Sequence, residues 1–297
     1  MVAPVTIAWP HGRSAAVVIT VAFEAELAIL SVAPDATDRA KSLSVGTYGA
    51  TRGVPRLLAE LARRGTPSTW FVPSALLERY PEQVGAIRDA GHELANCGVA
   101  LEDFGAVDTA VQLAMVRRAQ EAFQHSLGVL PTGFRVGRGE MSPGLPAALE
   151  AEGFTWTSSL RGDDRPHFHA APAGRLVEIP QHHQLDDGPY FAFNLDPPIP
   201  PGSPRIAPTG DVLDNWVTEF DAYHAEGLCF VLTLHPELIA TPGRIGMLAQ
   251  FLDHVHNRDV WLATAGEVAR FWGEHGPANP PEHPVEVYHR IIGATTP

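Results

Sequence analysis

Basic residues and long apolar runs are scarce in this chain. Its 297 residues include 21 lysines and arginines against 34 aspartates and glutamates, a formal net charge of −13. Because nucleic acids and anionic membranes are bound by clustered cations, we expect neither as a partner. No run of about eighteen apolar residues is present, and the first residues lack the regions of a secretory signal. The sequence therefore predicts a cytoplasmic protein whose substrate is a small molecule.

Cysteine is also nearly absent, since Cys97 and Cys229 are the only two. A reducing cytosol disfavours a bridge between them, so we expect two free thiols. The length is sufficient for one large α/β domain with a substantial core. We expect a single domain over residues 1–297.

Apolar runs bounded by glycine and proline alternate with helical patterns along the chain. The runs predict buried strands at residues 15–20, 69–72, 228–234 and 260–263. Apolar spacing predicts helices at residues 54–64, 81–90, 107–127, 145–151, 212–226 and 245–256. Such alternation is typical of a mostly parallel sheet covered by helices, which carries its chemistry at the carboxyl ends of the strands.

Two segments depart from this alternation. Residues 161–209 are rich in proline, glycine, histidine and aspartate and have little periodicity, so we expect a long, ordered, loop-rich insertion. From about residue 276 a proline-rich tail precedes a short apolar segment at 285–292. This tail suggests docking on a neighbouring subunit, and we expect a homo-oligomer, either a dimer or a tetramer.

A series of short motifs identifies a family. The clearest is GHELANCGVALE at residues 91–102. The others, in chain order, are TVAFEAE at 20–26, YGATRGVPRLL at 48–58, TWFVP at 69–73, GFR at 133–135, FTWTSSL at 154–160, EIP at 178–180 with LDDGPYF at 185–191, and LHP at 234–236. The series resembles the NodB-homology polysaccharide deacetylases, in the branch of peptidoglycan deacetylases and allantoinase-like enzymes. The resemblance implies a deformed (β/α) barrel of the α/β class.

The resemblance also implies a metal site that this chain has lost. Family members use one aspartate as base and bind a metal through a second aspartate and two histidines. Here those positions hold Ala22, Glu24, Cys97 and Leu101. Zinc needs about three protein ligands, and alanine and leucine supply none. We therefore expect neither a catalytic metal nor another cofactor.

Four polar residues remain as catalytic candidates, and the resemblance places them in one pocket. Arg135 can offer two parallel hydrogen bonds to an oxyanion, and His235 can exchange a proton near neutral pH. Glu24 is a candidate base if its pocket raises its pKa, and Asp187 is a candidate to orient His235 or to contact substrate. The alternative for Arg135 is a structural ion pair with Glu24 or Asp187, and for His235 a hydrogen-bonded core histidine.

Further side chains are candidates for binding the substrate. These are Cys97, Trp70, His183, Trp156, Tyr190 and Phe191. Cys97 is either a nucleophile or a small buried side chain. His183, with its neighbour His182, either forms a substrate wall or faces solvent, and the aromatic residues either line a pocket or belong to the core.

These residues support several hypotheses. The first is metal-independent hydrolysis of a C–N bond, in an amide or cyclic amide of a small molecule. A lyase, dehydratase, isomerase or cyclase acting on a specialised metabolite would use the same acid and base. A third is a non-catalytic binding protein, and a fourth is a deacetylase with a relocated metal, held by residues from the set Glu24, Cys97, His182, His183 and His235.

Overall fold

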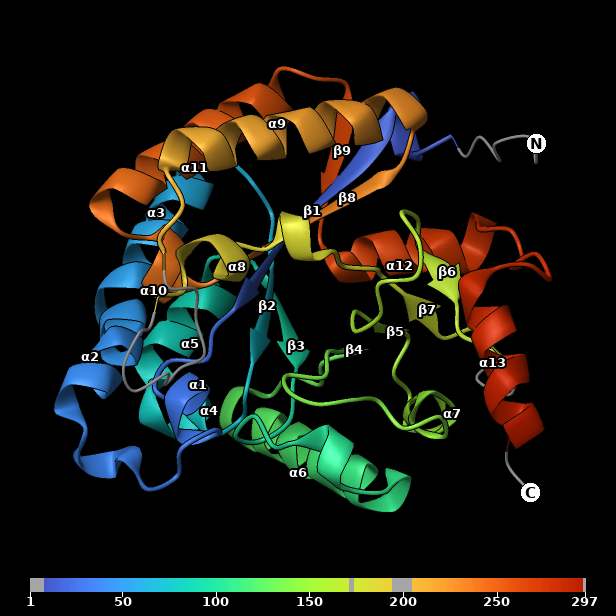
Figure 1. Cartoon of the computed structure of the whole chain (residues 1–297), viewed down its shortest axis with the longest axis horizontal. Coiled ribbons are helices and arrows are strands. Elements are labelled where there is room, and N and C mark those ends of the chain that lie inside the picture. The colour runs from blue at the N-terminus through green and yellow to red at the C-terminus, as the bar shows by residue number, and fades with distance from the viewer. Residues whose placement is uncertain (1–7, 171–173, 194–204, 296–297) are drawn as a thin grey trace.

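A curled sheet lies at the centre of the molecule, and helices cover its outer face (Figure 1). The computed structural model describes residues 8–170, 174–193 and 205–295. Within these residues nine strands form one sheet in the order β6-β7-β5-β4-β3-β2-β1-β8, and β9 also pairs with β1. All pairs are parallel except β6 with β7. This is the deformed (β/α) barrel expected from the sequence.

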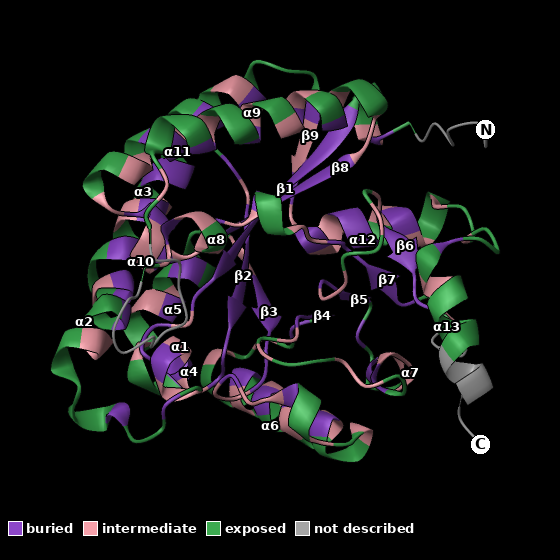
Figure 2. Cartoon of the chain, in the orientation of Figure 1, coloured by how far each residue is buried: buried purple, intermediate pink, exposed green. Residues whose placement is uncertain are grey.

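The central strand explains why the sheet is so deeply buried. All eight residues of β1, Ala15–Ala22, are buried, and the run contains five β-branched residues. Such continuous apolar runs are typical of parallel strands covered on both faces. Strand β1 pairs with β2 (Thr69–Val72), β8 (Cys229–Leu234) and β9 (Val260–Ala263). Figure 2 shows β1, β2 and β8 buried and part of β9 intermediate, while the outer faces of the surrounding helices are exposed.

The other strands are short. They are β3 (Glu93–Asn96), β4 (Gly133–Phe134), β5 (Trp156–Thr157), β6 (His167–Phe168) and β7 (Val177–Glu178). At the opposite edge of the sheet, Asp186 forms an isolated parallel bridge to Thr233 of β8. The chain after β7 therefore returns across the sheet to lie beside β8.

The longer helices surround this sheet. They are α2 (Ala40–Tyr48), α3 (Val54–Arg64), α5 (Pro81–Asp89), α6 (Thr109–Leu127), α7 (Leu145–Ala151), α9 (Thr209–Glu226), α11 (Pro242–His256), α12 (Ala265–His275) and α13 (Pro284–Thr295). Shorter turns of helix are α1 (Leu27–Leu30), α4 (Leu76–Arg79), α8 (Gly188–Phe191) and α10 (Pro236–Ile239). A π-helical turn, η3 (Gly49–Gly53), joins α2 directly to α3.

Local sequence accounts for the ends of these helices. Helix α3 has a proline in its first turn and stops at Gly65, whose φ of 59° is unfavourable for other residues. Helix α12 begins with a capping box, in which Thr264 and Glu267 each accept from the other's backbone N–H. No described helix is long and apolar enough to cross a membrane.

The predicted strands and long helices are confirmed, with bounds that differ by at most three residues. The segment at 161–209, predicted to be a loop-rich insertion, contains the two-residue strands β6 and β7 and the short helix α8. Two-residue strands are too short to show periodicity. Part of that segment, residues 171–173 and 194–204, lies outside the described residues. The tail segment predicted at 285–292 forms most of α13.

Candidate active site

Side chains from three segments meet where β1 and β8 end. Glu24 lies two residues beyond the end of β1, and His235 directly follows β8. Asp187 comes from the segment that bridges to β8 and begins α8. The parallel register of β1 and β8 brings their carboxyl ends to the same edge of the sheet.

His235 and Asp187 form the tightest polar pair of this group. The His235 Nδ1 lies 2.6 Å from Asp187 Oδ1, and the His235 backbone N–H donates to both carboxylate oxygens at 3.1 and 3.0 Å. The Asp187 side chain is fully buried, whereas that of His235 is 18% exposed. Burial opposes the positive charge on His235, but the Asp187 carboxylate prevails and holds its pKa well above its usual value. His235 is therefore an imidazolium with a fixed orientation.

Glu24 shares this environment and is partly buried. Burial has the largest influence on the pKa of Glu24, which it raises. The positive charges of His235 and Arg135 oppose that rise, and Asp186 adds to it. The result is a carboxylate more basic than usual beside a protonated histidine, which is the combination required for paired base and acid catalysis.

Arg135 is almost completely buried, and its charge acts on Glu24. Its Nε and Nη2 atoms donate to the backbone oxygen and Oγ of Ser158, both at 2.8 Å. Its guanidinium carbon lies 3.8 Å from the centre of the Phe71 ring. These two bonds occupy the edge of the guanidinium formed by Nε and Nη2, so a two-bond contact to an oxyanion would have to use the edge formed by Nη1 and Nη2.

One donor of Arg135 remains weakly engaged. Its Nη1 lies 3.4 Å from Thr20 Oγ1 and 3.5 Å from Thr233 Oγ1, at the long limit of hydrogen bonding. Burial lowers the pKa of Arg135 to about 10, so the group is still charged at neutral pH. Its hydrogen bonds go to hydroxyls and a backbone oxygen, so the alternative of a structural ion pair with Glu24 or Asp187 is not supported.

Glu237 is a member of this group that the sequence did not identify. Burial raises its pKa to about 7, and His235 and Glu24 are among the charges that act on it. Its Oε2 atom is buried and has no hydrogen-bond partner among the described residues. The sequence signal for Glu237 is the motif HPE at residues 235–237. The residue after the His–Pro pair lies in the first turn of α10, directly after β8.

The positions of the family's metal ligands are filled but do not form a metal site. Ala22 and Leu101 are buried and have no ligand atoms. Leu101 keeps a left-handed backbone, with φ of 59°, and lies so close to Gly137 that a β-carbon on that glycine would be 2.6 Å from its side chain. Burial and the Glu24 charge raise the pKa of the Cys97 thiol well above its usual value. A neutral buried thiol is a poor ligand and a poor nucleophile.

A relocated metal also finds no support in this donor set. Among the described residues, two groups place three potential ligand atoms within 4.8 Å of one another, and neither includes Glu24 or Cys97. One group is Asp186, Asp187 and His235. There Asp187 is the partner of His235 Nδ1 at 2.6 Å, and no ligand atom of this group is both buried and without a hydrogen-bond partner. Of the other proposed ligands, His182 lies 3.2 Å from Asp164 and His183 is exposed.

The six residues predicted to bind substrate fall into different environments. Cys97 lies close enough to Glu24 and Arg135 for both charges to act on the pKa of its thiol. Trp156 is fully buried against Phe71, beneath Arg135.

The remaining four lie apart from this group or at its edge. Trp70 packs against Phe23 and donates to Ser68 Oγ, so it belongs to the core, and His183 faces solvent. Tyr190 and Phe191 belong to α8, directly after Asp187. Tyr190 donates to the backbone of Gln184, and Phe191 is buried. We therefore omit Trp70 and His183 from the proposed substrate contacts.

The two cysteines are buried, and the motif residues His92 and Glu93 form hydrogen bonds with neighbouring residues. Cys97 and Cys229 are both free and buried, as expected. His92 Nδ1 lies 2.9 Å from Ser68 Oγ. The carboxylate of Glu93 accepts from Thr69 and from the backbone of Gly266.

Comparison with known proteins agrees with the motifs. A model of the polysaccharide deacetylase family matches residues 45–156. The peptidoglycan deacetylase of Helicobacter pylori is 27% identical over 259 residues, which cover 78% of this chain and 87% of that protein. The crystal structure of an allantoinase is 23% identical with a TM-score of 0.78, over 93% of this chain and 96% of the other, and shows a shared fold.

A nearer match decides the family. The crystal structure of a candidate polysaccharide deacetylase from Mycobacterium smegmatis is 33% identical to this chain. The two align over 93% of this chain and 96% of the other, with a TM-score of 0.87. The chain therefore belongs to the polysaccharide deacetylase family.

Proposed function

We propose that this protein hydrolyses a C–N bond in a small amide or cyclic amide without a catalytic metal. The observation that supports this most is the His235–Asp187 pair beside a carboxylate, Glu24, whose pKa is raised. Loss of the metal removes Lewis-acid assistance, but general acid and base groups each contribute about 100- to 10,000-fold in rate. Hydrolysis of an amide bond is also the reaction that family membership favours.

In the proposed reaction Glu24 takes a proton from water while the water oxygen bonds to the carbonyl carbon. The carbonyl π electrons move to oxygen, and the positive charge of Arg135, presented at Nη1, stabilises the oxyanion. The oxyanion then re-forms the carbonyl as the C–N bond breaks, and the imidazolium of His235 gives its proton to the departing nitrogen. Asp187 holds His235 in the orientation for that transfer.

A lyase or isomerase is the second candidate. It is favoured by the contacts of Arg135, since two of its three nitrogens are taken by Ser158 and strong oxyanion stabilisation is then limited. Proton transfer by Glu24 and His235 alone suits such chemistry. A binding protein that catalyses no reaction would not need the four charged side chains at the strand ends, which are Glu24, Arg135, Asp187 and His235.

Turnover in water enriched in ¹⁸O separates these candidates, once a substrate has been found among amides and cyclic amides. Hydrolysis places one solvent oxygen in the product carboxylate, which mass spectrometry detects. We expect that incorporation. Turnover that leaves the product unlabelled would identify the lyase or isomerase, and binding without turnover would identify the third candidate.

The pKa shifts predict a bell-shaped dependence of kcat/KM on pH. Glu24 acts when deprotonated, and because its pKa is raised, activity falls on the acid side at a pH above its usual 4.5. His235 acts when protonated, and because its pKa is raised, activity persists above its usual 6.5 and falls on the alkaline side. Kinetics across the pH range would test this, and Glu24→Gln should abolish the acid limb. An alkaline fall centred near 6.5 would contradict the assignment of His235.

The cytoplasmic location and the dimer or tetramer predicted from the sequence remain predictions. Sedimentation of the purified chain would determine its oligomeric state.

A further inference from the structure

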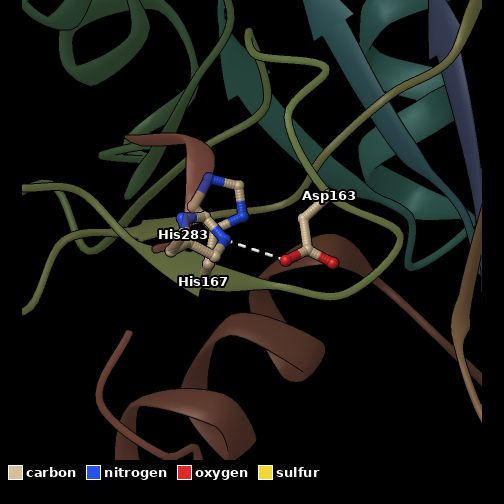
Figure 3. Close-up of side chains that lie close together, drawn as sticks. All are labelled: Asp163, His167 and His283. Atoms are coloured by element: carbon tan, nitrogen blue, oxygen red, sulfur yellow. Dashed lines mark hydrogen bonds and ion pairs between the residues drawn. The ribbon is translucent and has the colours of Figure 1, made fainter. Parts of the chain in front are cut away.

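A second cluster of potential metal ligands lies away from the candidate active site. Asp163 belongs to the loop after β5, His167 begins β6, and His283 immediately precedes α13. Their ligand atoms all lie within 4.8 Å of one another. Figure 3 shows the two imidazoles overlapping, with the Asp163 carboxylate directed toward them. The cluster therefore joins the edge of the sheet to the C-terminal tail.

His167 has a free lone pair in this cluster. Its Nδ1 lies 3.3 Å from the backbone oxygen of Arg165, a contact that requires the proton to be on Nδ1. The other ring nitrogen, Nε2, is buried and has no hydrogen-bond partner among the described residues. A buried nitrogen without a partner is rare and costly, which suggests that a group absent from the protein itself binds it.

Asp163 is held so that one oxygen faces the imidazoles. Its Oδ1 accepts from the backbone N–H groups of Asp164 and Arg165, at 2.7 and 3.0 Å. Its Oδ2 accepts from His283 Nε2 at 2.8 Å. Metal ligands are commonly oriented by hydrogen bonds to the atoms that do not bind the metal. Here the backbone of Arg165 takes part in orienting both ligands, through its N–H to Asp163 and its carbonyl oxygen to His167.

We propose that Asp163 Oδ2, His167 Nε2 and His283 Nε2 bind a divalent transition metal, with zinc the best match. Two imidazoles and one carboxylate are a common zinc ligand set, and imidazole is a weak ligand for magnesium or calcium. Bonds of roughly 2 Å in a tetrahedral site put ligand atoms about 3.4 Å apart. The 2.8 Å contact between His283 and Asp163 opens to reach that spacing, and the other separations, each within 4.8 Å, adjust toward it.

Binding also changes the proton on His283. In the metal-free arrangement its Nδ1 accepts from the Val285 backbone N–H at 3.2 Å, so the single proton lies on Nε2. With metal on Nε2, that proton moves to Nδ1 and the long bond from Val285 is lost. Val285 lies in the first turn of α13, where backbone N–H groups lack partners within the helix in any case.

The fourth position of the metal opens toward a cavity. A cavity of about 380 Å³ is lined by His167 together with Leu160, Val285 and Tyr288. Water or a small ligand fills the remaining coordination position from that side. Glu24, Arg135 and His235 are not among the residues that line this cavity. The metal site is thus separate from the proposed chemistry.

Zinc binding by the whole chain tests the proposal. The protein is first stripped with a chelator and then titrated with zinc chloride by calorimetry, with bound metal confirmed by elemental analysis. We expect one tight site per chain in the wild type. His167→Ala and Asp163→Asn should each weaken it by at least about 100-fold, since each removes a direct ligand. Circular dichroism of each variant checks that it folds.

His254→Ala is the matched control, because His254 forms a similar pair with Asp221, at 2.8 Å, without a second histidine in reach. It should bind zinc as the wild type does. His235→Ala provides the second comparison, since His235 belongs to the other cluster. If the wild type binds no zinc, or if His235→Ala rather than His167→Ala abolishes binding, the proposal is overturned.

Cobalt gives a result that does not depend on the variants folding. Co²⁺ bound by two imidazoles and a carboxylate in a tetrahedral site has strong visible absorption, whereas octahedral aqueous Co²⁺ absorbs weakly. We expect the strong spectrum to appear with one equivalent of Co²⁺ and to disappear on adding zinc. A weak, octahedral spectrum at saturation would contradict the proposed site.

Discussion

Replacing His235 by alanine is expected to lower kcat by at least about 100-fold, because general acid catalysis contributes that much or more. The change removes the imidazolium and leaves Asp187 buried with no side-chain partner. KM should change much less than kcat, since the proton is transferred in the transition state. Steady-state kinetics on the substrate identified by the labelling experiment would measure both constants.

The matched control is His254→Ala, which removes a histidine from a histidine–aspartate pair outside the site. Its activity should stay close to that of the wild type. Asp187→Asn supplies a further comparison, because it keeps the shape but removes the charge that raises the pKa of His235. Its alkaline limb should move to lower pH. Near-normal turnover in His235→Ala would exclude His235 as the acid.

Gly53→Ala is expected to destabilise the protein by about 2–3 kcal/mol, near the upper end of the usual cost of overpacking. Gly53 ends the π-helical turn η3, and an added β-carbon would lie 2.5 Å from the backbone oxygen of Pro236. Backbone atoms cannot move aside as a flexible side chain can. Since Pro236 directly follows His235, the variant should also lose activity. Urea denaturation gives the change in the free energy of unfolding.

Gly85→Ala is the control for this substitution. Gly85 also lies in a helix, α5, but an added β-carbon there would contact nothing within 4 Å. Replacing a helical glycine by alanine where the added methyl group meets no other atom typically stabilises by about 0.5–1 kcal/mol. The two variants should therefore change stability in opposite directions. Equal effects would mean that the approach of Pro236 to the helix is not what requires glycine at position 53.

The sequence predicts most of the longer elements of this fold, although helices α2 and α12 were not predicted. Helix α3 and strand β2 were predicted with their observed bounds because their apolar residues repeat clearly. Strands β5 and β7 were not predicted, since two residues have no period and form a strand only through their neighbours in the sheet. Whether such short strands form is determined by their pairing with neighbouring strands in the folded protein.

The same limit applies to the site. Glu24, Asp187 and His235 were predicted as a group from the motifs that contain them, and the structure places them together. The contact of Arg135 with Ser158 was not predicted, because it depends on the register of β4 and β5. Glu237 was missed because an acidic residue in the first turn of a helix is ordinarily explained by the helix dipole.

The gathering of acidic side chains at the end of β8 has a consequence for the release of products. Glu24, Asp186 and Glu237 all lie near His235 and act on its charge or on one another. Hydrolysis of a neutral amide produces a new carboxylate among them. Two negative charges roughly 6 Å apart repel by about 3 kcal/mol at an effective dielectric constant near 20. With an acyclic amide, the acid half of the product would therefore leave quickly, while the amine half, once protonated, would be the slower to depart.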